Sequence, residues 1–171
     1  MSEGLTGLPG AMSKIEQIYM DEALREARKA LEEDEVPVGA IVVCKRKVIA
    51  RAHNQMRMLK DPTAHAEMVA LTQAASYLKN ERLTGAIAYV TVEPCAMCAG
   101  ALILARVKRL VYGVDDPKTG ACGSVLDIAR NRKLNHRIDV KKGVLAEESR
   151  ILLKEFFKKK RRKKISKDYS L

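Results

Sequence analysis

The sequence predicts an α/β fold, a three-layer α/β/α sandwich with helices on both faces of a mixed five-stranded sheet. Two neighbouring β-branched runs predict an antiparallel hairpin, and the later short apolar strands alternate with helical patterns. A hairpin followed by strand–helix–strand units requires antiparallel and parallel pairs in one sheet. The chain has 171 residues, of which 47% are hydrophobic and 31% charged, and this suits one globular domain with a core of its own.

The first helix is expected to begin after Ser13, because serine commonly caps helix N-termini. It is expected to end before Pro37, since the residue that precedes a proline disfavours helical geometry. Apolar residues recur within it at steps of three and four, which predicts one buried face. These residues are Met20, Ala23, Leu24, Ala27, Ala30 and Leu31.

The hairpin is expected to pair Val38–Val43 with Val48–Ala52 across the charged run at 45–47. A second helix is expected from about Thr63 to Leu78, followed by a third strand over Ala86–Val92. The second helix is expected to face the core with Ala66, Val69, Ala70 and Ala74.

Pro94 suits the start of the next helix, because a proline costs nothing where the amide has no helical partner. The remaining expected elements are a helix over Cys95–Ala105, a strand over Arg109–Val114, a short helix over Val125–Arg130, a strand over Arg137–Val140 and an amphipathic helix over Glu147–Lys160. The sequence shows no repeat and no linker, so a single domain is expected at 14–157.

Two terminal segments flank this domain. Residues 1–13 are Gly-rich without an apolar run, so they are expected to be a flexible N-terminal arm rather than a signal peptide. Residues 158–171 form a basic C-terminal tail with eight Lys or Arg and one Asp, which supplies most of the formal net charge of +11. Such a tail can bind a polyanion through counterion release, act as a nuclear-localisation run, or only keep the protein in solution.

A cytoplasmic protein without a membrane partner is expected, because the longest apolar run, Ala96–Ala105, is far shorter than the ~20 residues of a membrane span. In a reducing compartment, a close pair such as Cys95 and Cys98 is typical of a metal or redox site rather than a disulfide. Cys44 lies in an apolar strand and is expected to be a buried thiol, and Cys122 is expected to be free.

The pattern His65-Ala66-Glu67 followed by Pro94-Cys95-Ala96-Met97-Cys98 carries the chemistry. Cys95 and Cys98 are three residues apart, so both sulfurs lie on the same side of a first helical turn. His65 and Glu67 are roughly 200° apart around a helix, so they address one point only if that helix meets it end-on. Two helix N-termini are therefore expected to face one point, where their dipoles favour thiolates and anions.

An imidazole and two thiolates are zinc ligands, and three protein ligands leave the open position for water that a catalytic zinc requires. Zinc lowers the pKa of such a water toward ~7, and Glu67 is expected outside the ligand shell as the catalytic proton carrier. The pattern H-x-E…P-C-x-x-C is a known signature of nucleobase deaminases. Two alternatives leave Glu67 without a purpose: a redox cysteine pair, and a structural zinc whose fourth ligand is Cys44, Cys122, His53 or His136.

Blocks outside this pattern carry a more specific resemblance, which spans about Ile15–Arg162. They are Asp34–Ala40, Asp61–Glu67, Val92–Gly100, Lys118–Ala121, Leu134–Arg137 and Phe156-Phe157. The chain resembles the bacterial tRNA-specific adenosine deaminases. The resemblance implies a cytidine deaminase-like fold, a homodimer, one Zn²⁺ per subunit on His65, Cys95 and Cys98, and conversion of adenosine to inosine at the wobble position of a tRNA anticodon.

By the same resemblance, Asn54 hydrogen-bonds the flipped base in a pocket lined by Val38 and Ala66. Contacts to the anticodon stem-loop are then expected from Asp116, Lys118, Asn135, His136 and Phe156. An amide offers a donor and an acceptor to a purine, and Asp116 can accept a hydrogen bond from a ribose hydroxyl. Each has a plainer alternative: a turn residue for Asn54, a surface lysine for Lys118, and core packing for His136 and Phe156.

Two other functions remain open on the sequence alone. A deaminase of a free base or nucleoside, such as guanine or cytosine, would use the same zinc chemistry without a basic tail. A non-enzymatic RNA-binding or zinc-structured module would keep the fold but have no use for Glu67.

Overall fold

A computed structural model describes residues 13–168, with side chains as far as Arg162. Most of the expected arm, residues 1–12, lies outside the described residues, as do residues 169–171. Helix α1 (Lys14–Glu32) begins directly after its N-cap Ser13, as predicted. The Ser13 Oγ accepts a hydrogen bond from the Glu16 N–H at 3.2 Å, and the Glu16 carboxylate accepts one from the Ser13 N–H at 3.1 Å. This reciprocal pair satisfies amides that lack helical partners.

The predicted mixed sheet is confirmed. The strands are β1 (Gly39–Cys44), β2 (Lys47–His53), β3 (Ile87–Val92), β4 (Arg109–Val114) and β5 (Asp139–Lys142). They lie in the order β2-β1-β3-β4-β5; β1 pairs antiparallel with β2 and β3, and β4 pairs parallel with β3 and β5. The fifth strand therefore begins two residues later than expected from the sequence.

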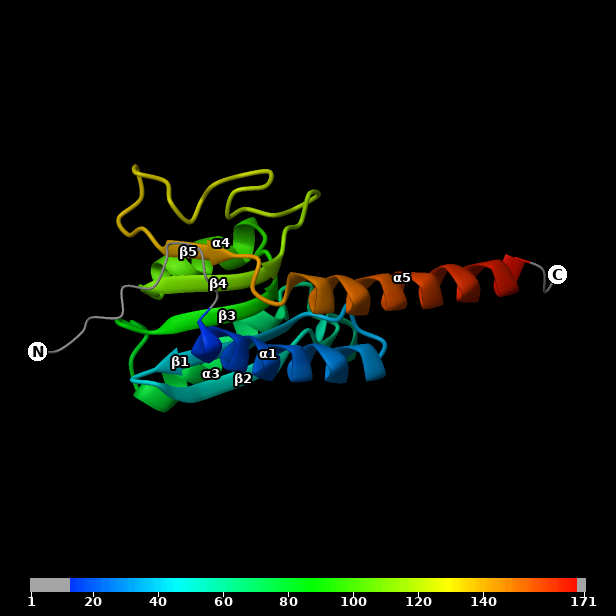
Figure 1. The fold of residues 1–171 in the computed structure, drawn as a ribbon, viewed down its shortest axis with the longest axis horizontal. Coiled ribbons are helices and arrows are strands. Elements are labelled where there is room, and N and C mark those ends of the chain that lie inside the picture. Colours follow the sequence, from blue (N-terminus) through cyan, green and yellow to red (C-terminus); the bar gives the residue numbers. More distant parts are fainter. Residues whose placement is uncertain (1–12, 169–171) are drawn as a thin grey trace, which may run out of the picture.

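Helices cover both faces of the sheet, so the three-layer prediction is also confirmed (Figure 1). Helices α1 and α5 (Ala146–Asp168) lie on one face, and α3 (Ala66–Leu78) and α4 (Ala96–Leu104) lie on the other. The strands alternate between these layers because successive side chains point to opposite faces. In β1, Ala40 and Val42 pack in the cluster with α3 and α4, whereas Ile41 and Val43 pack against α1.

Three helix predictions differ from the structure. The sequence pattern missed the short helix α2 (Met56–Leu59), which connects β2 to α3. Residues 125–130 lie within the described range but form no helix, because their chain folds back on Gly120, whose carbonyl accepts the N–H groups of Val125 and Leu126. Helix α5 does not end at Lys160 but continues to Asp168, so the expected basic tail is largely helical and extends past the sheet (Figure 1).

The topology brings several segments to one edge of the sheet. Strands β3 and β4 run parallel, so the residues after Val92 and after Val114 emerge together. Strand β1 begins at this edge because it runs antiparallel to β3. Strand β2 ends there because it runs antiparallel to β1. The start of α4 follows β3 directly, and α3 follows the end of β2 through α2.

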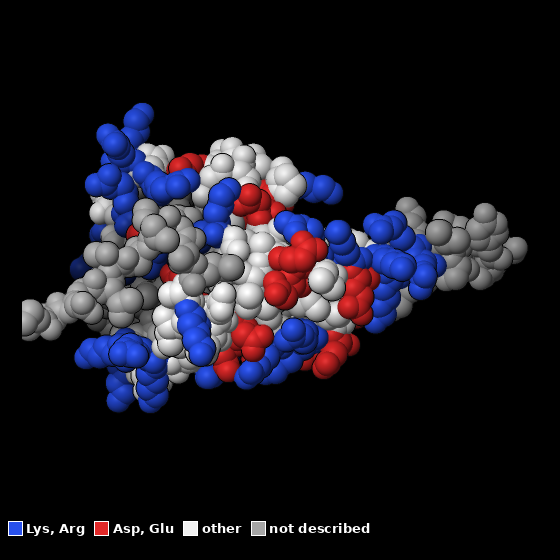
Figure 2. Space-filling view, in the orientation of Figure 1, with Lys and Arg blue, Asp and Glu red and all other residues white. Residues whose placement is uncertain are grey.

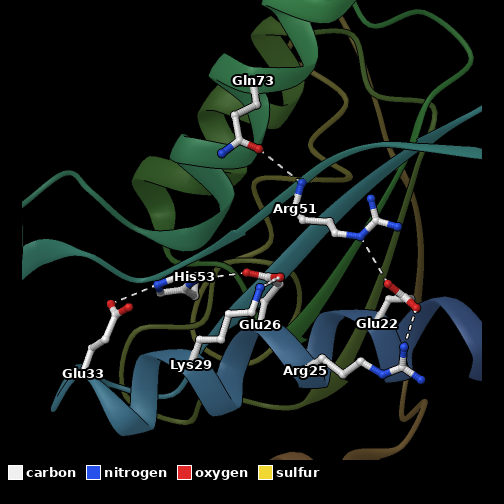
Figure 3. A network of polar contacts seen from close by, with 8 residues as sticks. All are labelled: Glu22, Arg25, Glu26, Lys29, Glu33, Arg51, His53 and Gln73. Atoms are coloured by element: carbon white, nitrogen blue, oxygen red, sulfur yellow. Dashed lines mark hydrogen bonds and ion pairs between the residues drawn. The ribbon is translucent and has the colours of Figure 1, made fainter.

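A network of polar contacts ties α1 to the end of β2 (Figure 3). The His53 Nδ1 lies 3.1 Å from Glu26, and its Nε2 lies 3.0 Å from Glu33. Burial alone would raise the pKa of Glu26, but hydrogen bonds with Lys29 and His53 together bring that pKa below its ordinary value. The network fixes the strand end that leads into Asn54. Within residues 13–168, no helix is long and apolar enough to cross a membrane.

Candidate functional site

The three residues predicted as metal ligands lie together. The His65 Nδ1 is 3.8 Å from the Cys95 Sγ and 3.6 Å from the Cys98 Sγ. All three ligand atoms lie within 4.8 Å of one another. Because Nδ1 faces both sulfurs, it is the ring nitrogen that is placed to coordinate a metal. Cys98 is buried, whereas Cys95 and His65 are half-buried and can be reached from outside.

Two helix N-termini meet at this group, as the spacing predicts. His65 is the N-cap of α3 and Cys95 is the N-cap of α4, and both have extended backbone. Neither side chain caps its own helix, so both are available as ligands. Pro94 lies just before the N-cap of α4 rather than in its first turn. The positive ends of both helix dipoles favour anionic ligands here.

The two thiols and the imidazole shift one another's pKa. Hydrogen bonds with Cys98 and His65 lower the pKa of the Cys95 thiol to about 4. The hydrogen bond with Cys95, together with burial, raises the pKa of Cys98. A divalent cation among these donors favours the thiolate at both positions, because thiols that coordinate a metal are deprotonated.

Glu67 lies one residue inside α3 and is buried. Burial raises its pKa above the usual range of a glutamate. Its Oε2 accepts no hydrogen bond from any residue that the structure describes. A buried carboxylate oxygen without a donor costs about 1–3 kcal/mol, so its position fits a donor that comes from outside the chain, such as water or substrate.

These residues fit a catalytic zinc better than a structural one. One nitrogen and two sulfurs are zinc donors, and no fourth Cys, His, Asp or Glu joins the group within the described part of the chain. His53 is engaged by α1, as described above. The His136 Nε2 instead donates to the Val107 carbonyl at 2.7 Å. The donor set therefore keeps the open position on which hydrolytic chemistry depends.

A cavity of 440 Å³ lies beside the ligand group. This volume lies within the range of about 300–1,000 Å³ that is usual for small-molecule sites. The cavity is walled by the sheet edge, the start of α3, the loop after β4 and one side of α5. Its lining includes Val38, Asn54, Glu67, Lys118, Leu153 and Phe157.

Asn54 lines the cavity, but its amide is already half used. The side-chain Oδ1 accepts a hydrogen bond from the Ala66 N–H at 2.8 Å. The backbone N–H of Asn54 donates to the Val38 carbonyl at 3.1 Å. An N–H donor must face the amide oxygen, which leaves the amino group as the part available to a ligand. Ala66 is fully buried and does not line the cavity, so it acts through its backbone.

The loop after β4 contains two predicted contact residues. The Asp116 Oδ1 accepts hydrogen bonds from the N–H groups of Lys118 and Thr119 at 2.9 and 3.2 Å, and its Oδ2 accepts one from the Thr119 hydroxyl at 2.6 Å. Although burial raises the pKa of Asp116, these hydrogen bonds bring it below the ordinary value. The carboxylate thus shapes its own loop, and Lys118 is exposed at the cavity rim.

The other expected substrate residues lie elsewhere. Asn135 and His136 line a separate surface hollow, where the Arg106 guanidinium donates to the Asn135 carbonyl at 2.8 Å. Phe156 is 4% exposed and packs in the interior, so it does not line the cavity. Its neighbour Phe157 is 47% exposed and does line it.

Some cavity residues were not singled out by the sequence pattern. Leu153 and Phe157 are four residues apart on α5, and this helical spacing could have marked them as one stripe. Glu93 is a buried acid directly before Pro94, and its position at the end of an apolar strand is the only signal that it offers.

Comparison with known proteins gives consistent results. The family described as MafB19-like deaminase matches residues 14–161. The tRNA-specific adenosine deaminase of Bacillus subtilis (strain 168) is 45% identical over 149 residues, which cover 87% of this chain and 92% of the relative. That of Agrobacterium fabrum (strain C58) is 48% identical over 143 residues, which cover 84% of this chain and 94% of the relative.

Solved structures agree with this picture. One of them has 47% identity and a TM-score of 0.77. It comes from biochemical and structural studies of A-to-I editing by tRNA:A34 deaminases at the wobble position of transfer RNA. The match covers 80% of this chain and 99% of that one. A guanine deaminase from Nitrosomonas europaea has 26% identity and a TM-score of 0.69, and the match covers 91% of this chain and 97% of that one.

Proposed function

Since this chain belongs to the family of tRNA-specific adenosine deaminases, we propose that it hydrolyses adenosine to inosine and ammonia at the wobble position of a tRNA anticodon. The observation that carries the proposal is the placement of Glu67 in the lining of the cavity together with His65 and Cys95 of the ligand group. A buried carboxylate oxygen without a donor, next to three metal donors, is the arrangement that hydrolytic deamination needs.

The chemistry divides between the metal and this chain's own residues. Zinc bound by His65, Cys95 and Cys98 supplies a Lewis acid that lowers the pKa of water. Glu67 takes a proton from the attacking water at its Oε2. It delivers this proton to the ring nitrogen beside the attacked carbon, then takes the second proton from the hydroxyl now bound to that carbon and passes it to the amine as the carbon–nitrogen bond breaks and the carbonyl forms. The leaving group is therefore neutral ammonia.

The base is held by other residues that line the cavity. The amino group of Asn54 donates to an acceptor nitrogen of the purine, because the amide oxygen is held by Ala66. Val38, Leu153 and Phe157 are apolar walls that exclude water from the base. Exclusion of water strengthens the polar contacts within the site.

The RNA backbone is expected to follow the basic end of α5. Figure 2 shows Lys and Arg gathered over this part of the helix, beyond an acidic stretch. The described cations there are Lys158, Lys159, Lys160, Arg161 and Arg162. The Lys160 Nζ is held 2.8 Å from Asp34, whereas Arg161 and Arg162 are exposed. Such side chains bind phosphate through counterion release.

A cytoplasmic homodimer is part of the proposal. The structure exposes large apolar side chains at Met58, Leu59 and Leu104, with 55%, 53% and 80% of their surface in contact with solvent. Apolar surface of this kind supports association with a second copy. Free thiols as metal ligands suit a reducing compartment. Sedimentation equilibrium would test the dimer, and a strictly monomeric species would contradict it.

The function is tested with an unmodified anticodon stem-loop that carries adenosine at the first anticodon position. The RNA is then digested to nucleosides and separated by chromatography, and inosine is the expected product. The rate of inosine formation should fall steeply as the salt concentration rises. Free adenine, guanine and cytosine are assayed in parallel. Turnover of a free base without turnover of the stem-loop would contradict the proposal and favour a small-molecule deaminase.

A further inference from the structure

Glu93 lies where the metal-binding turn and the loop after β4 meet. It follows β3, precedes Pro94 and Cys95, and is 3% exposed. Its N–H donates to the Val114 carbonyl at 2.9 Å, which extends the pairing of the two parallel strands by one residue. From this position its side chain reaches the loop formed by residues 115–124, named the substrate loop below.

The carboxylate of Glu93 gathers the substrate loop around itself. Its Oε1 accepts hydrogen bonds from the N–H groups of Cys122 and Ser124 at 2.9 and 3.0 Å. Its Oε2 accepts one from the Asp116 N–H at 3.0 Å and one from the Ser124 hydroxyl. Both oxygens therefore face donors, and a carboxylate is a side-chain group that can accept at both.

Gly120 permits this close approach. A Cβ at this position would lie 2.3 Å from the Glu93 Oε2 and 2.5 Å from the Asp116 carbonyl, and neither distance is tolerated. The loop also returns to the metal turn. Gly120 pairs with Cys95 in an isolated bridge, and the Ala121 N–H donates to the Pro94 carbonyl at 2.9 Å. The carboxylate thus fills the space between the two segments.

We propose that Glu93 is a positioning residue that holds the substrate loop at a fixed distance from the metal-binding turn. Its effect passes through Asp116, because the Glu93 carboxylate accepts a hydrogen bond from the Asp116 N–H. The Asp116 carboxylate in turn accepts one from the Lys118 N–H and so shapes the turn that carries Lys118. Glu93 therefore sets how the loop meets RNA while His65 and the cysteines bind metal without it. This inference rests on the proposed function, since it assumes that RNA contacts the loop.

The variant Glu93→Gln tests it with almost no change in shape. Whichever way the amide is turned, its NH₂ group faces a backbone N–H, that of Asp116 on one side or those of Cys122 and Ser124 on the other. The expected result is zinc content equal to that of the wild type, a KM for the stem-loop raised about tenfold or more, and kcat within about threefold.

Glu16→Gln is the matched control, because Glu16 is also a buried carboxylate that accepts a backbone N–H but lies on α1 outside the cavity. It should leave KM unchanged. An unchanged KM in Glu93→Gln would overturn the inference. So would joint loss of zinc and activity, because Glu93 would then support the metal turn itself.

Gly120→Ala keeps the inference testable if Glu93→Gln does not fold. The added Cβ should push away both the Glu93 carboxylate and the Asp116 backbone, and so reproduce the rise in KM with zinc retained. An unchanged KM would overturn the inference. Wild-type enzyme that forms no inosine from the stem-loop overturns the proposed function and this inference with it. Wild-type turnover together with an unaffected Glu93→Gln overturns the inference alone.

Discussion

The side-chain oxygen of Asn54 accepts a hydrogen bond from the backbone N–H of Ala66 at 2.8 Å, next to the proposed metal ligand His65. One contact thereby fixes both the N-terminal turn of α3 and the direction in which the amide presents its amino group. The residues proposed to bind the base and the metal are thus held by the same short segment.

Replacement of Asn54 by Asp keeps an acceptor for the Ala66 N–H but removes the donor for the base. We expect kcat/KM for the stem-loop to fall about tenfold to a hundredfold, since a lost hydrogen bond with an unpaired partner costs about 1–3 kcal/mol. Asn54→Ala removes both contacts, so its kcat/KM should fall at least as far. Wild-type kcat/KM in Asn54→Asp would show that the amino group does not hold the base.

Phe156 and Phe157 are adjacent but should respond differently to truncation. Phe156→Ala removes a buried ring and should lower the free energy of unfolding by about 3–5 kcal/mol. Phe157→Ala removes a half-exposed ring from the cavity, so it should raise KM for the stem-loop and change stability by less than about 1 kcal/mol. Urea denaturation and steady-state kinetics on both variants check this; the opposite assignment would mean that Phe156 contacts the RNA.

The contribution of Glu26 to stability should depend on pH. Its pKa in the folded protein lies below the ordinary value of 4.5, because hydrogen bonds with Lys29 and His53 outweigh the effect of burial. A depressed pKa gives stability that is fully present above the unfolded value and is lost as pH falls through the folded one. Glu26→Gln should therefore be less stable than wild type at pH 7, by roughly 1 kcal/mol after screening of the exposed Lys29.

The same comparison by urea denaturation at pH 3 supplies the control for Glu26. The gap between variant and wild type should narrow there, because the wild-type carboxyl is then becoming protonated. A gap that is equal at both pH values would show that ionisation of Glu26 has no part in the network of Figure 3.

The basic end of α5 should govern the salt dependence of RNA binding. Replacement of both Arg161 and Arg162 by Gln should weaken stem-loop binding at low salt. Each lost phosphate contact should reduce the slope of log K against log salt by about 0.7–0.9. Fluorescence anisotropy across a salt series measures this slope. An identical slope in the variant would leave these residues a solubilising role only.

Much of the fold was predictable because it follows local periodicity. The hairpin, the helices α1, α3 and α4 and the strand β4 were found from alternating or helical apolar patterns that tertiary packing reinforces. The helix predicted at 125–130 was wrong because the apolar side chains suggest a helix, whereas the N–H groups of Val125 and Leu126 donate to the Gly120 carbonyl. Such a turn within the loop leaves no periodic trace in the sequence.

The site divides in the same way. The spacing of His65, Cys95 and Cys98 predicts a shared point because helix geometry relates positions within a turn, and the structure places these side chains together. The resemblance assigned Phe156 to the RNA, whereas its place on the apolar stripe of α5 favoured core packing, and the structure buries it. The stripe did not tell that Phe157 lines the cavity. Glu93 was missed because its partners lie 23 to 31 positions further along the chain.

The most direct test of the mechanism measures metal content and inosine formation together in Glu67→Gln. The variant keeps all three ligands, so it should bind one zinc ion per chain like the wild type, while inosine formation falls by about a thousandfold or more. Chelation of the wild type should abolish inosine formation, and added zinc should restore it. Inosine formation at the wild-type rate in zinc-loaded Glu67→Gln, or in metal-free wild type, would contradict the account.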